Sequence, residues 1–106
     1  MKDYQKLTPE EFKDVVKSGC TVVEFSAEWC GDCKFLEPFL PEIEASFPKA
    51  QFVKIDRDGA LDLAIELGIM GIPSFLVYQD GQEIGRLVNK DRKTKEEVID
   101  FIKSVD

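Results

Sequence analysis

The sequence predicts an α/β domain in which a mixed sheet of five, or four, strands carries helices on both faces. The length of 106 residues leaves room for one domain only, which we place at residues 1–106. Short strand-like runs alternate with stretches whose apolar residues recur at helical spacing. The helices between strands favour parallel pairing, and a turn signal near the end of the chain favours an antiparallel hairpin.

Thr8 and Glu11 form a capping box, which predicts that the first helix begins at this point. Gly19 is expected to end that helix, since glycine commonly follows the last helical residue. Leu7 and its neighbours are expected to add a short edge strand before the helix. The β-branched and aromatic run 21–25 predicts a strand.

A second helical pattern runs from about residue 33 to 47. Pro38 and Pro41 interrupt it, and because each lacks a backbone N–H we expect a kink or a break there. Residues 51–56 alternate like a strand, and residues 61–67 have the apolar spacing of a short helix.

The last third of the chain reads as a hairpin followed by a helix. Residues 74–78 are a strand-like run, Asp80-Gly81 is a hairpin turn signal, and residues 83–88 can pair antiparallel with the first run. Thr94 and Glu97 repeat the capping-box pattern and predict a terminal helix. Its apolar face comprises Val98, Phe101, Ile102 and Val105.

Composition excludes several classes of function. The net charge is −7 and there is no histidine, which argues against nucleic acid or an anionic membrane as partner and against histidine-based catalysis. The amino terminus has no apolar run and no stretch is long enough to span a membrane, so we expect a cytoplasmic protein without a signal peptide.

The cysteines carry the chemistry. Cys30 and Cys33 are separated by two residues and lie between a predicted strand and a predicted helix. Residues i and i+3 at a helix start lie on one face, within disulfide reach, and the helix terminus favours a thiolate at Cys30. The remaining cysteine, Cys20, is most simply a small apolar residue. With no histidine and one further cysteine, a structural zinc site within the chain is disfavoured, although a metal site shared across a dimer stays open.

The segment from Val23 to Lys34, which contains Trp29-Cys30-Gly31-Asp32-Cys33, resembles the thioredoxin active site. Pro38 matches the helix-kinking proline of that family, and Gly71-Ile72-Pro73-Ser74 resembles its cis-proline segment. The order of elements is similar to the thioredoxin fold from end to end. The resemblance implies a thiol–disulfide oxidoreductase that reduces protein disulfides, binds no cofactor, works as a monomer and is regenerated by a thioredoxin-reductase system. A binding or adaptor module on the same scaffold remains the alternative.

Glu24 is a charged residue within an apolar strand. Burial would raise its pKa towards neutrality, as a general acid–base requires. The family usually has aspartate here, serving proton transfer to the second cysteine, so the resemblance implies that role for Glu24 with Cys33. Phe52 is expected at the place of the lysine that often faces the buried acid in thioredoxins, which would leave Glu24 without a cationic neighbour.

A substrate-docking surface is expected around Cys30, and a cis bond before Pro73 would leave the backbone of Ile72 available to an extended substrate. Its residues are Trp29, Gly31, Asp32, Ile72, Pro73 and Val88. Asp32 replaces the proline usual in the family, and a carboxylate beside Cys30 opposes its thiolate. We therefore hypothesise a reductant and not a disulfide-forming oxidase.

Overall fold

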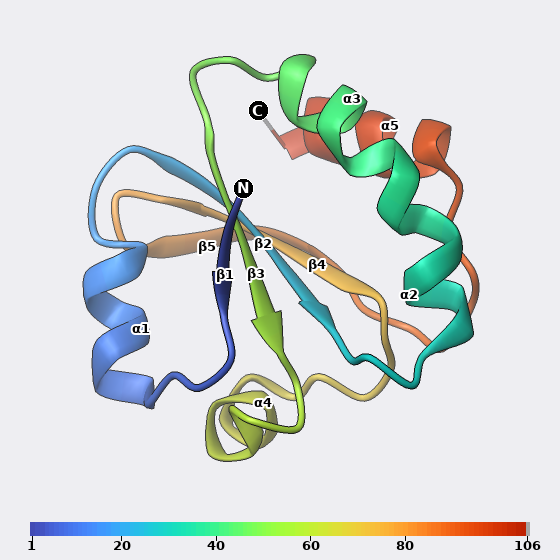
Figure 1. Cartoon of the computed structure of the whole chain (residues 1–106). Helices are drawn as coiled ribbons and strands as arrows, with labels where there is room; N and C mark the ends of the chain where they lie inside the picture. The colour runs from blue at the N-terminus through green and yellow to red at the C-terminus, as the bar shows by residue number, and fades with distance from the viewer. Residues whose placement is uncertain (106) are drawn as a thin grey trace.

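The computed structural model describes residues 1–105 and has the expected α/β architecture, with a five-stranded sheet and helices on both faces (Figure 1). The strands are β1 (Lys2–Tyr4), β2 (Cys20–Ser26), β3 (Gln51–Asp56), β4 (Ser74–Gln79) and β5 (Gln82–Leu87). The helices are α1 (Pro9–Val15), α2 (Gly31–Leu36), the 3-10 turn η1 (Glu37–Phe39), α3 (Leu40–Ala45), α4 (Leu61–Leu67) and α5 (Lys95–Val105).

The strand order in the sheet is β1-β3-β2-β4-β5. β3 pairs in parallel with both β1 and β2, whereas β4 runs antiparallel to β2 and to β5. β2 is therefore a central strand, and its carboxyl end leads directly into α2. This placement puts the two cysteines at the edge of the sheet where the chain passes from strand to helix.

Alternation along the strands divides the core into two layers. α1 and α4 cover one face, where Phe12 and Leu63 pack with Val23 of β2. α2, α3 and α5 cover the other face, where Ile43 and Ile102 pack with neighbouring strand residues. Figure 1 shows the same division, with α1 and α4 on one side of the sheet and α2, α3 and α5 on the other.

The amino-terminal segment confirms the helix start and corrects the edge strand. Thr8 and Glu11 form both reciprocal bonds of the capping box, at 2.9 and 3.1 Å. The edge strand, however, is β1 at Lys2–Tyr4, and the expectation that it would lie at Leu7 was wrong. Leu7 is instead buried in the core layer of α1, because its side chain gains more from apolar burial than an edge position would provide.

The expected interruption of the second helix is confirmed. α2 stops at Leu36, η1 contains Pro38, and α3 resumes with Pro41 in its first turn. Each proline lacks the N–H that a continuous helix would need, so the hydrogen-bond ladder breaks between them. The result is a short helix that carries the cysteines and is anchored in the core by Leu36.

The terminal hairpin turns at Asp80 and Gly81, which both have positive φ (51° and 88°) as a tight two-residue hairpin requires. A register shift opposite Gly85 marks a β-bulge in β5. A Cβ on Gly85 would lie 2.4 Å from a methyl carbon of Val105, so the glycine lets α5 approach the sheet closely. α5 itself starts with the predicted capping box of Thr94.

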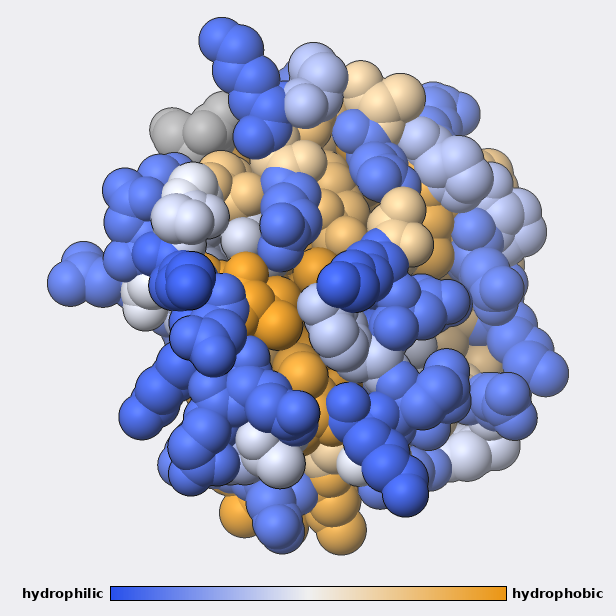
Figure 2. All heavy atoms as spheres, turned by 60° about the vertical axis from the view of Figure 1, so that its left-hand side comes forward, coloured by the Kyte–Doolittle hydropathy of each residue, from blue (hydrophilic) through white to orange (hydrophobic). Residues whose placement is uncertain are grey.

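The face of the molecule seen in Figure 2 is largely hydrophilic. Figure 2 shows the side of the molecule that carries α1, where hydrophilic side chains border a narrow apolar strip. Within residues 1–105, every helix is too short or too polar to cross a membrane.

Candidate active site

Cys30 is the residue that caps α2, and its sulfur accepts a hydrogen bond from the backbone N–H of Cys33 at 3.1 Å. The chain turns into the helix at this residue, so the sulfur faces the unsatisfied N–H groups of the first turn. The Cys30 thiol lies 3.8 Å from the carbonyl oxygen of Ile72, to which it donates. Both cysteines are thiols in this structure. The two motifs about forty residues apart in the sequence thus meet at one sulfur atom.

The two cysteines open onto different depressions, although both side chains are mostly buried (6 % and 5 % exposed). Cys30 lines a shallow depression of about 410 Å³ bordered by Trp29 and Ile72. Cys33 lines a separate polar depression of about 370 Å³ on the β1 side, bordered by Lys54 and other charged residues. The two cysteines therefore line two different depressions, one beside Trp29 and Ile72 and one lined by polar residues.

Glu24 is buried, with 1 % of its surface exposed, and its Oε1 accepts no hydrogen bond from the described residues. Burial raises the pKa of its carboxyl from 4.5 to about 8, against a lowering by Lys54. Glu24 thus combines deep burial with a carboxyl that titrates near neutral pH. This combination was expected from its place in an apolar strand.

The expectation that Glu24 would lack a cationic neighbour was wrong. Lys54, and not Phe52, stands beside Glu24 in the register of β2 and β3, whereas Phe52 pairs with Val22. Counting along the strand from the sequence alone placed Phe52 beside Glu24, two residues away from the true neighbour, Lys54. Because side chains alternate between the two faces of a sheet, an error of two residues keeps the face and changes the neighbouring residue. The lysine also lies 3.9 Å from Asp3 of β1, so the two strands β3 and β1 contribute charges near the acid.

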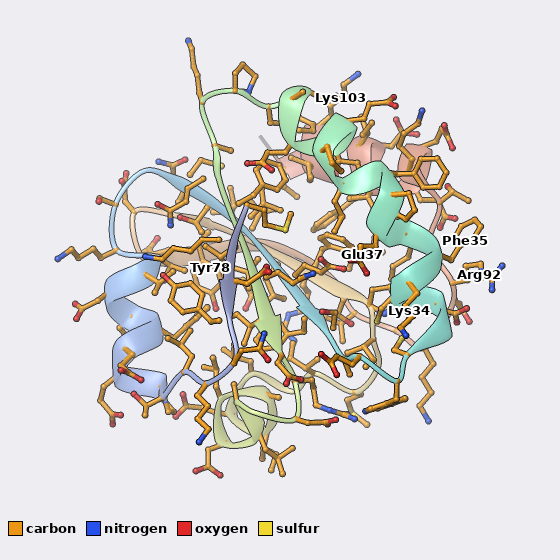
Figure 3. The ribbon with its side chains drawn as sticks, viewed as in Figure 1. Lys34, Phe35, Glu37, Tyr78, Arg92 and Lys103 are labelled. Atoms are coloured by element: carbon orange, nitrogen blue, oxygen red, sulfur yellow. The ribbon has the colours of Figure 1, made fainter. Side chains whose placement is uncertain are left out.

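Cys33 resists ionisation on its own. Burial raises the pKa of its thiol from 9.0 to about 12, with further increases from the hydrogen bond to Cys30 and from the nearby Glu24 carboxyl. Glu37 of η1 also raises the pKa of Glu24 and, like Cys33, lines the polar recess. Figure 3 shows Glu37 directed from its helix towards the sheet. Because the pKa of the Cys33 thiol is raised to about 12, this thiol needs a base beside it to act as a nucleophile near neutral pH.

The segment before β4 forms the second wall of the site. The Ile72–Pro73 peptide bond is cis, as expected. Gly71 lies directly against the loop that follows β5, since a Cβ there would be 2.3 Å from the carbonyl oxygen of Asn89. Val88 packs against the core layer that contains Cys30, Cys33 and Ile72. Of the residues expected in the docking surface, Trp29, Gly31, Asp32 and Ile72 border the depression beside Cys30, whereas Pro73 and Val88 do not line it.

Trp29 and Gly31 lie on either side of Cys30 in the chain, and both border the depression beside it. Trp29 is 65 % exposed, and its indole N–H donates to Asp58 at 2.6 Å while Arg57 lies over its ring at 5.6 Å. The hydrogen bond from Trp29 lowers the pKa of Asp58. Gly31 has an ordinary φ and a Cβ there would meet nothing within 4 Å, so no tight turn demands glycine; its effect is to leave space beside Cys30.

Two basic residues near the site were missed by sequence reasoning, which treated residues 89–97 as a solvated loop and helix start. Arg92 forms an ion pair with Asp32 at 2.9 Å, across sixty residues of sequence. Lys93 is only 1 % exposed, and its ammonium is bound by oxygens of Asn89 and Asp91. Nothing local in a run of charges signals which member turns inward, because that depends on the packing of the loop.

Within residues 1–105, no group of three or more histidine, cysteine, aspartate or glutamate side chains is arranged to hold a metal ion. The chemistry available at this site is that of two adjacent thiols, one capping a helix and one beside a buried carboxyl. Such a pair can exchange with a disulfide and close into one.

Comparison with known proteins agrees with this geometry. The family model described as Thioredoxin matches residues 3–104. The chain is 37 % identical over 89 residues to thioredoxin of Chlamydia muridarum, a match that covers 83 % of this chain and 87 % of that protein. It is 40 % identical over 74 residues to mitochondrial thioredoxin-2 of Schizosaccharomyces pombe, covering 70 % of this chain and 56 % of that protein.

Among solved structures, the oxidised form of mitochondrial thioredoxin 3 from Saccharomyces cerevisiae superposes with a TM-score of 0.78. That match has 31 % sequence identity and covers 94 % of this chain and 93 % of the other. Sequence, fold and the pair of cysteines therefore agree. The chain belongs to the thioredoxin family of thiol–disulfide oxidoreductases.

Proposed function

We propose that this protein reduces disulfide bonds of other proteins, with Cys30 as nucleophile and Cys33 as resolving thiol. The observation that carries the proposal is the hydrogen bond from the Cys33 N–H to the Cys30 sulfur at 3.1 Å. A donor aimed at sulfur stabilises the thiolate, which is the species that attacks disulfides. The second wall, at Ile72 and the cis Pro73, supports a substrate chain lying across that sulfur.

In the first step the Cys30 thiolate attacks one sulfur of the substrate disulfide. A Cys30–substrate disulfide forms, and the other substrate sulfur leaves as a thiolate. In the second step the Cys33 thiolate attacks Cys30 and releases the second substrate sulfur. The substrate gains two electrons and two protons, and the protein is left with a Cys30–Cys33 disulfide.

Glu24 is proposed as the base of the second step. The thiol of Cys33 has a pKa of about 12, so the proton must be removed for attack near neutral pH. The Glu24 carboxyl, with a pKa of about 8, is matched to accept that proton and return it. The polar recess lined by Cys33, Lys54 and Glu37 lies beside Cys33, which supports proton exchange between solvent and this thiol.

The docking surface proposed for the substrate consists of Trp29, Gly31, Asp32, Ile72, Pro73 and Val88. Four of them, Trp29, Gly31, Asp32 and Ile72, border the depression beside Cys30, which supports this assignment. Pro73 follows Ile72 in the chain, and Val88 packs against the core layer that contains Cys30 and Ile72. We further propose that a thioredoxin-reductase system regenerates the dithiol, and that the protein acts as a cytoplasmic monomer. The family supports the first of these proposals, and the acidic surface is compatible with a protein that avoids anionic membranes.

The function is tested by insulin reduction in the presence of dithiothreitol. The intact protein is expected to accelerate the appearance of insulin-chain turbidity over dithiothreitol alone, because Cys30 and Cys33 form an adjacent pair of thiols that can exchange with a disulfide. Protein whose thiols have been alkylated beforehand serves as the control and is expected to give the dithiothreitol rate. An intact, folded protein that gives no acceleration contradicts the proposal.

The direction of the chemistry is tested with Asp32→Pro. A carboxylate beside Cys30 disfavours the thiolate of the reduced form, so the intact couple is expected to be the more reducing of the two. We expect its equilibrium constant with glutathione to differ from that of the variant by roughly two- to tenfold. Proline is compatible with the first turn of α2, where N–H groups have no partner within the helix. An intact couple more oxidising than the variant contradicts a role as reductant.

A further inference from the structure

The loop 89–93, between β5 and α5, contacts both walls of the candidate active site. Lys90 of this loop borders the depression beside Cys30. The backbone of Asn89 lies against Gly71, directly before Ile72 and the cis Pro73. Arg92 reaches the opposite wall at Asp32, one of the two residues between the cysteines. The loop therefore joins the helix of the nucleophile to the cis-proline segment.

Arg92 makes two contacts with α2. Its Nε donates to Oδ1 of Asp32 at 2.9 Å, and its guanidinium carbon lies 4.4 Å from the centre of the Phe35 ring. Asp32 and Phe35 are three residues apart, so they lie on one side of the helix. Figure 3 shows Arg92 and Phe35 next to each other on the outer side of α2. The arginine is thus aligned along the helix by a carboxylate and by an aromatic face.

The loop that carries Arg92 is internally cross-linked. The ammonium of the buried Lys93 donates to the side chain of Asn89 at 2.8 Å, to its carbonyl at 3.4 Å and to the carbonyl of Asp91 at 2.6 Å. The Asn89 side chain also accepts from the N–H of Asp91 at 2.9 Å. An exposed ion pair is usually weakened by the entropy of ordering two long side chains. Here the hydrogen bonds of Lys93 and Asn89 hold the backbone beside Arg92 in place. Less conformational entropy is therefore lost when the ion pair with Asp32 forms.

We propose that Arg92 is a positioning residue of the thiol–disulfide reaction, which offsets part of the charge of the Asp32 carboxylate and thereby weakens its repulsion of the Cys30 thiolate. The repulsion that remains is what the Asp32→Pro comparison measures. The proposal rests on the proposed function of Cys30 as nucleophile. Asp32 stands two residues from the nucleophile, and an unpaired carboxylate there disfavours a second negative charge. The guanidinium at 2.9 Å offsets that repulsion without touching the sulfur itself.

A double-mutant cycle of Arg92→Gln and Asp32→Asn tests this assignment. The readouts are the rate of Cys30 alkylation by iodoacetamide at neutral pH and the equilibrium constant with glutathione. Arg92→Gln is expected to slow alkylation by roughly two- to fivefold and to make the couple more reducing by a similar factor, the range expected of a partly exposed ion pair. In the Asp32→Asn background the same substitution is expected to change either readout by less than about 1.5-fold, because no carboxylate remains to be neutralised.

Lys103→Gln is the matched control, since it removes one positive charge from the far end of α5. It is expected to leave both readouts unchanged, and urea unfolding of each variant checks that the fold is kept. The assignment is overturned if Arg92→Gln changes the alkylation rate and the glutathione equilibrium equally with and without Asp32→Asn. It is also overturned if Arg92→Gln changes neither readout in either protein. High salt is also expected to reduce the difference between intact protein and Arg92→Gln, because the Debye length falls to about 3 Å at 1 M.

Failure of this inference is distinguishable from failure of the proposed function. If the intact protein does not accelerate insulin reduction, the function itself is contradicted. If it does, but Arg92→Gln and Asp32→Asn have independent effects on alkylation and on the glutathione equilibrium, the assignment of Arg92 alone is overturned.

Discussion

Cys30→Ser is expected to abolish disulfide reduction, while Cys33→Ser is expected to retain the first step and accumulate the mixed disulfide. A serine hydroxyl is not ionised near neutral pH and is a poor nucleophile, so loss of Cys30 removes the attack itself. We expect turnover to fall by roughly three orders of magnitude or more in either variant. With Cys33→Ser, the Cys30–substrate bond forms and no internal thiol is present to break it. Insulin turbidity with dithiothreitol measures the loss. Mass spectrometry of a separate quenched mixture of the reduced variant with insulin, free of dithiothreitol, detects the trapped adduct.

Cys20→Ser is the matched control for removal of a thiol. Cys20 is the first residue of β2, at the end of the strand remote from Cys30. The Cys20→Ser protein is expected to retain turnover close to that of the intact protein. A trapped adduct on Cys33 in the Cys30→Ser protein would reverse the assigned roles. Turnover that survives the loss of either cysteine would rule out the two-step exchange.

Glu24→Gln is expected to stabilise the fold increasingly as the pH rises. The Glu24 carboxyl has a pKa of about 8 in the folded protein and 4.5 as its ordinary value, so the folded state holds the proton more tightly. The stability linked to that proton is complete below about pH 4.5 and is lost as the pH rises through about 8. The range of 3.5 pH units between these values corresponds to an upper limit on the order of 5 kcal/mol. Glutamine does not titrate, so the Glu24→Gln protein does not lose this stability as the pH rises.

Urea unfolding of both proteins at a series of pH values from about 5 to 9 measures this difference. The advantage of Glu24→Gln is expected to be small at the acidic end and to reach several kcal/mol at the alkaline end. Glu66→Gln removes an exposed carboxylate from α4 and is expected to change stability by less than about 0.5 kcal/mol at either end. A Glu24→Gln advantage that is the same throughout the series contradicts burial of an ionisable carboxyl.

The same variant bears on the second step of the reaction. Loss of a general base is expected to slow resolution of the mixed disulfide by roughly a hundredfold near neutral pH, with the first step unchanged. Rapid-quench measurement of the adduct separates the two steps. If resolution by Cys33 is as fast in Glu24→Gln as in the intact protein, Glu24 is not the base.

Local rules predicted the elements well where one cause dominated. The capping boxes at Thr8 and Thr94, the break at Pro38 and the turn at Asp80-Gly81 each follow from a backbone requirement carried by a few neighbouring residues. The edge strand was misplaced at Leu7 because a short parallel strand is defined by its partner in the sheet and has little pattern of its own. Short edge strands of this kind are identified only when the strand with which they pair is known.

The cysteine pair and the buried glutamate were recognisable from the sequence because two cysteines at a spacing of three and a lone glutamate in an apolar strand are local patterns. Which charges surround them was decided by tertiary structure alone. The register of β2 against β3 places Lys54 beside Glu24, and the packing of the loop 89–93 places Arg92 on Asp32. Electrostatic interactions act through space between residues that the chain brings together only on folding, and so they leave no periodic trace in the sequence.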